Sequence, residues 1–263
     1  MLYTVNMNIL SKTDLKEFLD YKVNEFNRPE FIELDPISIP HQFSLKEDIE
    51  IAAFLTATIS WGNRKAILGA ANQMIQIMGE SPYDFIINCD DFKSNQISNF
   101  YYRTFNGVDF CYFLESIRNI YLNHGGLESI FNDLTSRYSI QESISEFKHV
   151  FFELPHPTRT LKHVSDPRTG SAAKRLNMML RWLIRKDKKG VDFGLWKEIN
   201  PSKLSIPLDV HSGNTARKLG MLTRKQNDAK AVVDLDSVLR ELDPKDPVKY
   251  DFALFGLGVI EKF

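Results

Sequence analysis

The sequence predicts an all-α fold. Apolar residues recur with the period of an α-helix along nearly the whole chain, whereas the period-two alternation of a strand is almost absent. Proline and glycine residues separate the helical segments from one another. The 263 residues, 43% of them hydrophobic, suffice for one large domain or two small ones, and this composition excludes collagen-like, low-complexity and disordered classes.

The first half of the chain is predicted to form a series of helices with recognisable ends. Residues 48–60 are apolar and alanine-rich, so this helix is expected to be buried on most sides. Gly79 is expected to end the next helix, and Ser81 followed by Pro82 is typical of an N-cap and a first helical residue. Asp109 is predicted to cap a later helix. The expected helices are 48–60, 65–78, a short one from Pro82, 110–124, 127–137 and 140–153.

The second half begins with an irregular, proline-punctuated segment over about 155–169 and continues as helices. Asp209 is expected to start the helix that ends at Gly220, and either Asn227 or Asp228 to start the following one. The expected helices are 172–186, a short one over about 192–199, 209–220, 229–243 and 248–259.

The charges are unevenly distributed along the chain. The formal net charge is -1, which taken alone argues against a nucleic-acid partner. The window from Arg159 to Lys189, however, holds ten lysines and arginines and two aspartates, so it carries +8 and the remainder carries -9. An acidic body with one concentrated basic stretch is typical of a phosphate-binding protein, although solvated basic faces without a partner are common.

Several features bear on the compartment of the protein. No run of about 18 apolar residues is present, so we expect no membrane-spanning helix. The N-terminus lacks a basic region and a small-residue cleavage site, so we expect no signal peptide. Cys89 and Cys111 alone cannot build a zinc or iron–sulfur site and are expected to be buried thiols. These observations together predict a cytoplasmic protein.

Two of the helix starts carry residues with potential chemistry. A glycine turn at Gly170 precedes the helix that contains Lys174, and the N–H groups of such a helix end can hold a phosphate. Positive neighbours and the helix dipole favour the neutral, nucleophilic form of an amine, so Lys174 is a candidate nucleophile. A carboxylate at a helix N-cap, as expected for Asp209, can stabilise a developing positive charge or accept a proton.

Each of these residues also has a purely structural interpretation. Lys174 could be one more solvated lysine of a basic helix, Asp209 an N-cap and nothing more, and Gly170 a simple joint between helices. We expect His211 to be a structural histidine near the site that makes hydrogen bonds, and neither a base nor a metal ligand.

Three motifs and a tail follow one another between Gly170 and Gly258. They are G-S-A-A-K-R-L-N (170–177), P-L-D-V-H (207–211), A-R-K-L-G (216–220) and D-P-V-K-Y-D-F-A-L-F-G-L-G (246–258). The series resembles the helix-hairpin-helix/Gly-Pro-Asp superfamily of DNA glycosylases, in which a hairpin L-P-G-V-G-x-K-T-A precedes V-D-T-H at a helix start and an ending like R-x-x-R-L-G. More narrowly, it looks like a bacterial branch similar to the archaeal 8-oxoguanine DNA glycosylases.

The resemblance implies catalytic roles for two residues. Lys174 matches the lysine that attacks the sugar C1′ atom in bifunctional members, and Asp209 matches the aspartate of the catalytic members. The resemblance also implies that the hairpin grips a backbone phosphate and that a loop near Trp61 contacts DNA or the flipped base. The residues implied to bind DNA are Arg168, Gly170, Ser171, Arg175, Trp61, Asn63 and Arg64.

The chain departs from the pattern of the superfamily in four places. Ala172 replaces the second glycine of the hairpin, so its grip on a phosphate could differ. Gly213 lies inside the helix after Asp209, where a glycine costs about 1 kcal/mol relative to alanine, so we expect a less rigid segment. The gap between Lys174 and Asp209 is 35 residues, longer than in endonuclease III. The two cysteines also exclude a four-cysteine iron–sulfur cluster.

The resemblance implies a two-lobed helix-hairpin-helix DNA glycosylase-like fold. Residues 80–208 would form a central lobe with the hairpin near 165–175, and residues 1–79 would pack with residues 209–263 as the other lobe. The implied function is base-excision repair by a DNA N-glycosylase with AP-lyase activity, which removes a damaged base such as an oxidised purine through a lysine Schiff base. Duplex DNA is the expected partner of a monomer that needs no cofactor and no metal.

Two other functions remain open at the level of sequence. The chain could be a catalytically inactive DNA- or RNA-binding helical protein of the same fold, or a helical scaffold for protein interactions. The enzymatic interpretation requires that Lys174 and Asp209 face one cleft with room for a base.

Overall fold

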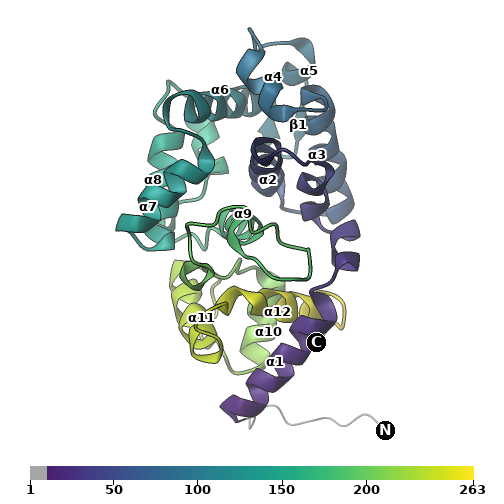
Figure 1. Cartoon of the computed structure of the whole chain (residues 1–263), viewed down its shortest axis with the longest axis vertical. Coiled ribbons are helices and arrows are strands. Elements are labelled where there is room, and N and C mark those ends of the chain that lie inside the picture. Colours follow the sequence, from purple (N-terminus) through teal and green to yellow (C-terminus); the bar gives the residue numbers. More distant parts are fainter. Residues whose placement is uncertain (1–10) are drawn as a thin grey trace.

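The computed structural model describes residues 11–263, and most of them are helical (Figure 1). The all-α prediction is therefore confirmed. The α-helices are α1 (Lys12–Phe26), α2 (Lys46–Ile59), α3 (Arg64–Met78), α4 (Pro82–Asn88), α5 (Asn95–Ser98), α6 (Gly107–Asn123), α7 (Leu127–Arg137), α8 (Ile140–Phe151), α9 (Lys174–Ile184), α10 (Val210–Lys218), α11 (Ala229–Leu242) and α12 (Tyr250–Val259). Strands β1 (Tyr101–Tyr102) and β2 (Phe105–Asn106) form a short antiparallel hairpin.

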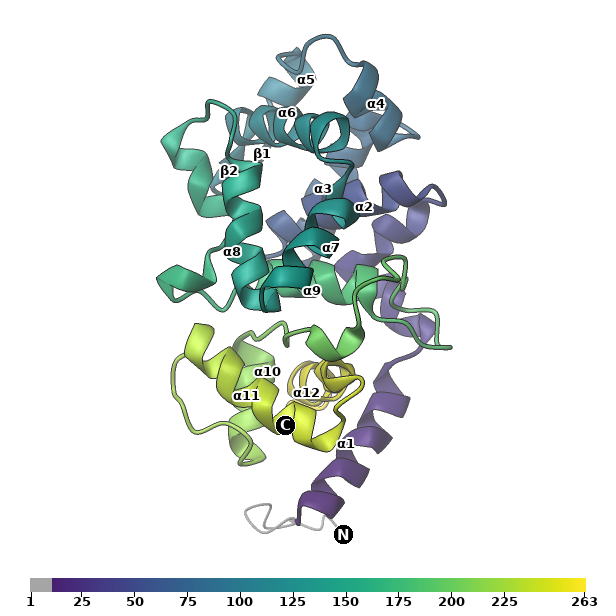
Figure 2. The same cartoon turned by 60° about the vertical axis from the view of Figure 1, so that its left-hand side comes forward.

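The helices form two groups with α9 between them (Figures 1 and 2). In the lower group α12 packs against α1 and α10, so the N-terminal helix joins the C-terminal ones. In the upper group α2 packs against α3, α4 and α9. Of the described residues 11–79, the structure thus places α1 with the C-terminal helices, where Phe31 of the following segment also contacts α12, and it places α2 and α3 with the central helices.

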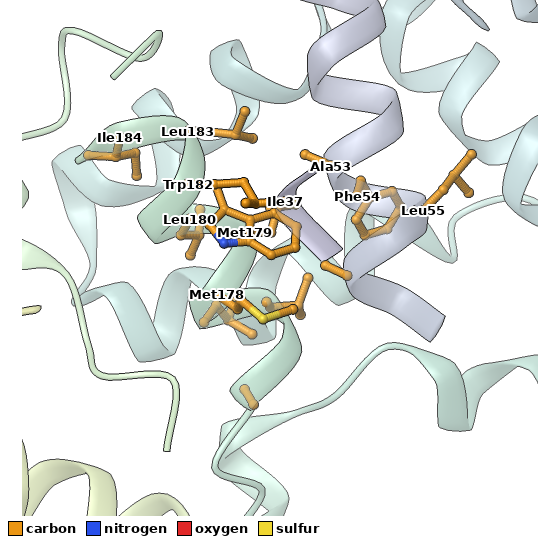
Figure 3. Close-up of a cluster of buried hydrophobic side chains, with 14 of the residues drawn as sticks. Ile37, Ala53, Phe54, Leu55, Met178, Met179, Leu180, Trp182, Leu183 and Ile184 are labelled. Atoms are coloured by element: carbon orange, nitrogen blue, oxygen red, sulfur yellow. The ribbon is translucent and has the colours of Figure 1, made fainter. Parts of the chain in front are cut away.

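Helix α2 lies at the centre of the upper group. Every residue from Asp48 to Ile59 is buried, which confirms the expectation of a helix buried on most sides. The ring of Phe54 lies 5.3 Å from Phe151 and 5.7 Å from Phe113, in the aromatic core. The other side of α2 faces α9, where Trp182 is fully buried near Ile37 (Figure 3). The core therefore fixes α9, which carries Lys174 at its first residue.

Helix ends follow the predicted capping residues in most places. The side chains of Ser81 and Asp228 accept hydrogen bonds from the first turns of α4 and α11, as expected for N-caps. The prediction for Asp109 is wrong, because Asn106 is the N-cap of α6 and Asp109 is the third helical residue of a capping box. Asp109 Oδ2 accepts a hydrogen bond from the backbone N–H of Asn106 at 3.0 Å.

The short helix expected over 192–199 is not present. The backbone N–H of Phe193 donates to the carbonyl of Trp182 at 2.8 Å, and that of Trp196 donates to the carbonyl of Leu183 at 3.0 Å. These bonds satisfy carbonyls at the C-terminal end of α9 and hold the segment against it. Tertiary partners therefore override the local helical pattern.

Two further observations concern the remaining sequence predictions. Cys89 and Cys111 are free thiols that are half-buried and not fully buried as expected, and burial beside Glu115 raises the pKa of Cys111 to about 11. Among residues 11–263 no helix combines the length and the apolar character that a membrane crossing requires.

Candidate functional site

A cavity of about 870 Å³ is lined by residues from both groups of helices. Its walls come from the start of α9, the start of α10, one side of α12 and the loop between α2 and α3. Lys174 and Asp209 both line this cavity. The two residues that the sequence singled out for chemistry, 35 positions apart, therefore face a common space.

Lys174 is directed toward the cavity by the turn before α9. Gly170 has a φ of 92° and Ala173 a φ of 44°, so two residues of the turn adopt a left-handed conformation. For Ala173 this conformation is uncommon and costs free energy, which points to a constraint on the direction of the chain. Lys174 is half-buried, and its amine has no hydrogen bond or ion pair within residues 11–263.

Asp209 is the N-cap of α10, as predicted. Its Oδ1 atom accepts hydrogen bonds from the backbone N–H groups of His211 at 2.8 Å and Ser212 at 3.0 Å. Its Oδ2 atom accepts no hydrogen bond from any residue that the structure describes. The carboxylate is therefore held through one oxygen, while the other oxygen is left for a ligand or a proton.

The backbone of Asp209 is held by a second contact, which the sequence did not suggest. Asn227 Nδ2 donates to the Asp209 carbonyl at 2.9 Å, and Arg217 Nη2 donates to Asn227 Oδ1 at 2.6 Å. A Cβ atom on Gly213 would lie 2.5 Å from Asn227 Oδ1. From the sequence we expect Gly213 to make the helix less rigid. The structure gives this glycine a packing role, because it makes room for the Asn227 side chain that holds the backbone of Asp209.

Two buried carboxyls that sequence reasoning missed also line the cavity. Burial raises the pKa of Asp251 to about 6, and the nearby charge of Asp209 adds to this rise, whereas Arg181 and Lys174 oppose it. Burial also raises the pKa of Asp35, whose Oδ1 accepts a hydrogen bond from the Ile37 N–H at 3.1 Å. Only the tertiary structure brings these carboxyls to the cavity, although Asp251 lies within the tail motif that the sequence singled out.

The predicted loop residue Trp61 and the predicted cation Arg175 meet at the cavity wall. The Arg175 guanidinium lies 5.0 Å from the centre of the Trp61 ring, and it donates a hydrogen bond to the carbonyl of Thr58. Burial lowers the pKa of Arg175 to about 10. The Trp61 carbonyl accepts a hydrogen bond from Tyr102 Oη at 2.7 Å. Arg175 therefore stabilises the loop that forms this wall.

Asn63 and Arg64 follow Trp61 and also line the cavity. Asn63 is the N-cap of α3, and its Oδ1 accepts a hydrogen bond from the Ala66 N–H at 3.3 Å. The Arg64 guanidinium lies 5.5 Å from the centre of the Phe255 ring on α12. This contact brings residues from the upper and lower groups together across the cavity.

The other predicted DNA-binding residues lie outside the cavity lining. Arg168 forms an ion pair with Glu146 at 2.5 Å, so its charge is compensated. The Gly170 carbonyl accepts a hydrogen bond from the Ala229 N–H at 3.0 Å, and Ser171 pairs with Asp228 in an isolated β-bridge. The hairpin is thus attached to the start of α11.

The predicted basic window is not one continuous cationic surface. Four of its ten cations form ion pairs with acids, and two of these, Arg181 and Arg185, are buried. Arg181 pairs with Asp192 and Asp251, and Arg185 pairs with Asp192. Burial of a cation requires such partners, so these arginines stabilise the junction of the two groups and cannot bind phosphate.

His211 differs from its predicted role as a hydrogen-bonding structural histidine. Its side chain lies on the exposed face of α10 and lines the cavity. The ring makes no hydrogen bond among the described residues, and its centre lies 6.4 Å from the centre of the Phe255 ring, with the two rings nearly perpendicular. His211 is therefore available to a ligand.

Comparisons with known proteins give one family assignment. Neither the curated proteins nor the solved structures contain a match to this chain. Residues 35–260 match the family of proteins of unknown function DUF2400, and this match includes every residue that lines the large cavity except Phe31. The chain belongs to the DUF2400 family.

Proposed function

We propose that the protein is a DNA N-glycosylase with AP-lyase activity and the two-lobed fold of the helix-hairpin-helix superfamily. One observation carries the proposal. An amine without a partner, on Lys174, and a carboxylate oxygen without a partner, on Asp209, face the same cavity, which is large enough for a base. A lysine nucleophile paired with a carboxylate is the combination that Schiff-base chemistry at a sugar requires.

The reaction uses these two groups in sequence. The Asp209 carboxylate accepts a proton from the Lys174 amine, and the Nζ lone pair forms a bond to C1′ of the nucleotide. The bond from C1′ to the base nitrogen breaks, and the electron pair leaves with the base, which takes a proton from water. Opening of the sugar gives an imine between Nζ and C1′, and loss of a C2′ proton then expels the 3′ phosphate.

The cavity walls suit a base that has left the duplex. Trp61 and Phe255 offer aromatic surface, and flipped bases are bound by stacking and by hydrogen bonds to their edges. The carboxyl groups of Asp35 and Asp251 offer hydrogen-bond acceptors in the same space. We further propose that the base removed by the enzyme is an oxidised purine.

The test is borohydride trapping on duplexes that carry 8-oxoguanine, an oxidised pyrimidine, uracil or an abasic site. Borohydride reduces the imine to a stable amine, so the wild-type protein is expected to form a covalent adduct with at least one duplex. Lys174→Ala should abolish the adduct and Asp209→Asn should reduce it by at least about tenfold. Lys162→Ala is the matched control, because this exposed lysine lies in the same basic window and lines no described cavity.

The same experiment separates the enzyme from a catalytically inactive relative. Duplex binding without excision or an adduct on any substrate would reject the glycosylase and support a nucleic-acid-binding protein. An adduct that survives Lys174→Ala would reject the proposed nucleophile.

A further inference from the structure

A second, smaller cavity lies on the exposed side of α10, next to the end of α12. Its volume is about 330 Å³, within the range of small-ligand pockets. Its lining residues are His211, Asn214, Arg217, Lys218, Gly258 and Phe263. The α10 residues among them recur at helical spacing, so one face of the helix presents all four to the cavity. His211 lines both this cavity and the large one.

The cations of the small cavity lack acidic partners. Arg217 donates to the Arg224 carbonyl at 2.7 Å and to Asn227 Oδ1 at 2.6 Å, and both acceptors are neutral. Lys218 Nζ lies 5.5 Å from the centre of the Phe263 ring and forms no ion pair with an acidic side chain of residues 11–263. Two of the lining side chains are cations and none is acidic, in contrast to Arg181 and Arg185, whose charges are neutralised by ion pairs.

We propose that the small cavity is a phosphate-binding subsite. The ammonium of Lys218, the guanidinium of Arg217 and the amide of Asn214 are donors of the kinds that bind phosphate oxygens. The hollow shape distinguishes the site from a solvated basic face, and Phe263 forms an apolar wall beside the ammonium.

The position of the small cavity along α10 indicates which phosphate it would bind. This part of the inference rests on the proposed glycosylase function. Asp209 at the start of α10 faces the large cavity, and Lys218 lies nine residues further, about 13 Å along the helix. A strand whose nucleotide enters the large cavity therefore has a neighbouring phosphodiester within reach of the small one. A free phosphate compound is the other source of the same chemistry.

Titration of the full chain with inorganic phosphate tests the subsite directly. Backbone amide NMR signals of Asn214, Lys218 and Phe263 are expected to shift saturably. Lys218→Ala should weaken the binding at least about tenfold, as expected for the loss of one charge-assisted contact. Lys225→Ala is the matched control, because this exposed lysine lies in the next loop and lines neither cavity. Absence of a shift, or equal shifts in both variants, overturns the proposal.

Binding to a duplex with an uncleavable abasic analogue identifies the source of the phosphate. If the subsite holds a DNA phosphodiester, Lys218→Ala should make the negative slope of log K against log salt shallower by about 0.9, while Lys225→Ala should leave it unchanged. If inorganic phosphate binds but Lys218→Ala leaves the salt dependence of duplex binding unchanged, the ligand of the subsite is a free phosphate compound. The phosphate titration requires no catalysis. If the glycosylase proposal fails, phosphate still binds but no borohydride adduct forms; if the subsite proposal fails, phosphate does not bind, whatever the borohydride result.

Discussion

The packing of Gly213 against Asn227 leads to a sharp prediction about two glycines. Gly213 in α10 and Gly69 in α3 both lie inside helices, where alanine is normally favoured by about 1 kcal/mol. A Cβ atom on Gly69 would meet no atom within 4 Å, whereas one on Gly213 would lie 2.5 Å from Asn227 Oδ1. The same substitution should therefore stabilise the protein at one site and destabilise it at the other.

The magnitude follows from the contacts that Gly213→Ala displaces. Movement of Asn227 breaks its bond to the Asp209 carbonyl, worth about 1 kcal/mol, and the charge-assisted bond from Arg217, worth about 1.5–3 kcal/mol. The helical gain of about 1 kcal/mol offsets part of this loss. We expect Gly213→Ala to lower the free energy of unfolding by about 1.5–3 kcal/mol, and Gly69→Ala to raise it by about 0.5–1 kcal/mol.

Urea denaturation followed by far-UV circular dichroism measures both values. The effects of Asn227→Ala and Gly213→Ala on the free energy of unfolding should not be additive, because removing the Asn227 amide also removes its clash with the new Cβ atom. If Gly213→Ala and Gly69→Ala stabilised the protein equally, the packing role of Gly213 would be refuted. Gly213 would then only make the helix less rigid, as expected from the sequence.

Three other predictions concern buried charges and the core. Because burial raises the folded-state pKa of Asp251 from 3.8 to about 6, the contribution of its protonated form to stability is full below pH 3.8 and is lost as the pH rises through 6. In urea unfolding from pH 4 to 7, the free energy of unfolding should therefore depend less on pH in Asp251→Asn than in the wild type. An equal pH dependence in both proteins would contradict the raised pKa of Asp251. Arg181→Ala should lower the free energy of unfolding by about 3–5 kcal/mol, against less than about 1 kcal/mol for Arg168→Ala, and similar values would contradict the difference in burial. Trp182→Ala should cost about 3–5 kcal/mol by the same denaturation assay, and a cost under 1 kcal/mol would contradict its place in the core.

Local signals in the sequence predicted most of the helices. Ser81, Asp209 and Asp228 are short polar residues before apolar periodic segments, and capping depends only on the next few residues. The segment 192–199 has a helical pattern, yet its N–H groups bond to the end of α9. Helix α1 was not predicted, although Ser11 and Asp14 form a capping box at its start, because its apolar face is narrow and only three of its residues are buried.

The candidate site was predictable to the extent that it rests on motifs. Lys174 and Asp209 lie in motifs that can be recognised along the chain, and the structure brings them to one cavity. The partners of the basic window could be predicted only in part, because some of the acids that neutralise it come from distant segments. Asp192 follows the window closely, but Asp251 is 70 residues from Arg181. The net charge of +8 over residues 159–189 therefore overestimated the number of cations that are free to bind phosphate.

The role of Lys174 as the nucleophile is the central claim, and one measurement tests it most directly. The wild-type protein is trapped with borohydride on its best duplex and digested, and the modified peptide is identified by tandem mass spectrometry. We expect the reduced sugar to be attached to Nζ of Lys174. Attachment at another lysine or at the N-terminal amine would contradict the account, as would the absence of any adduct.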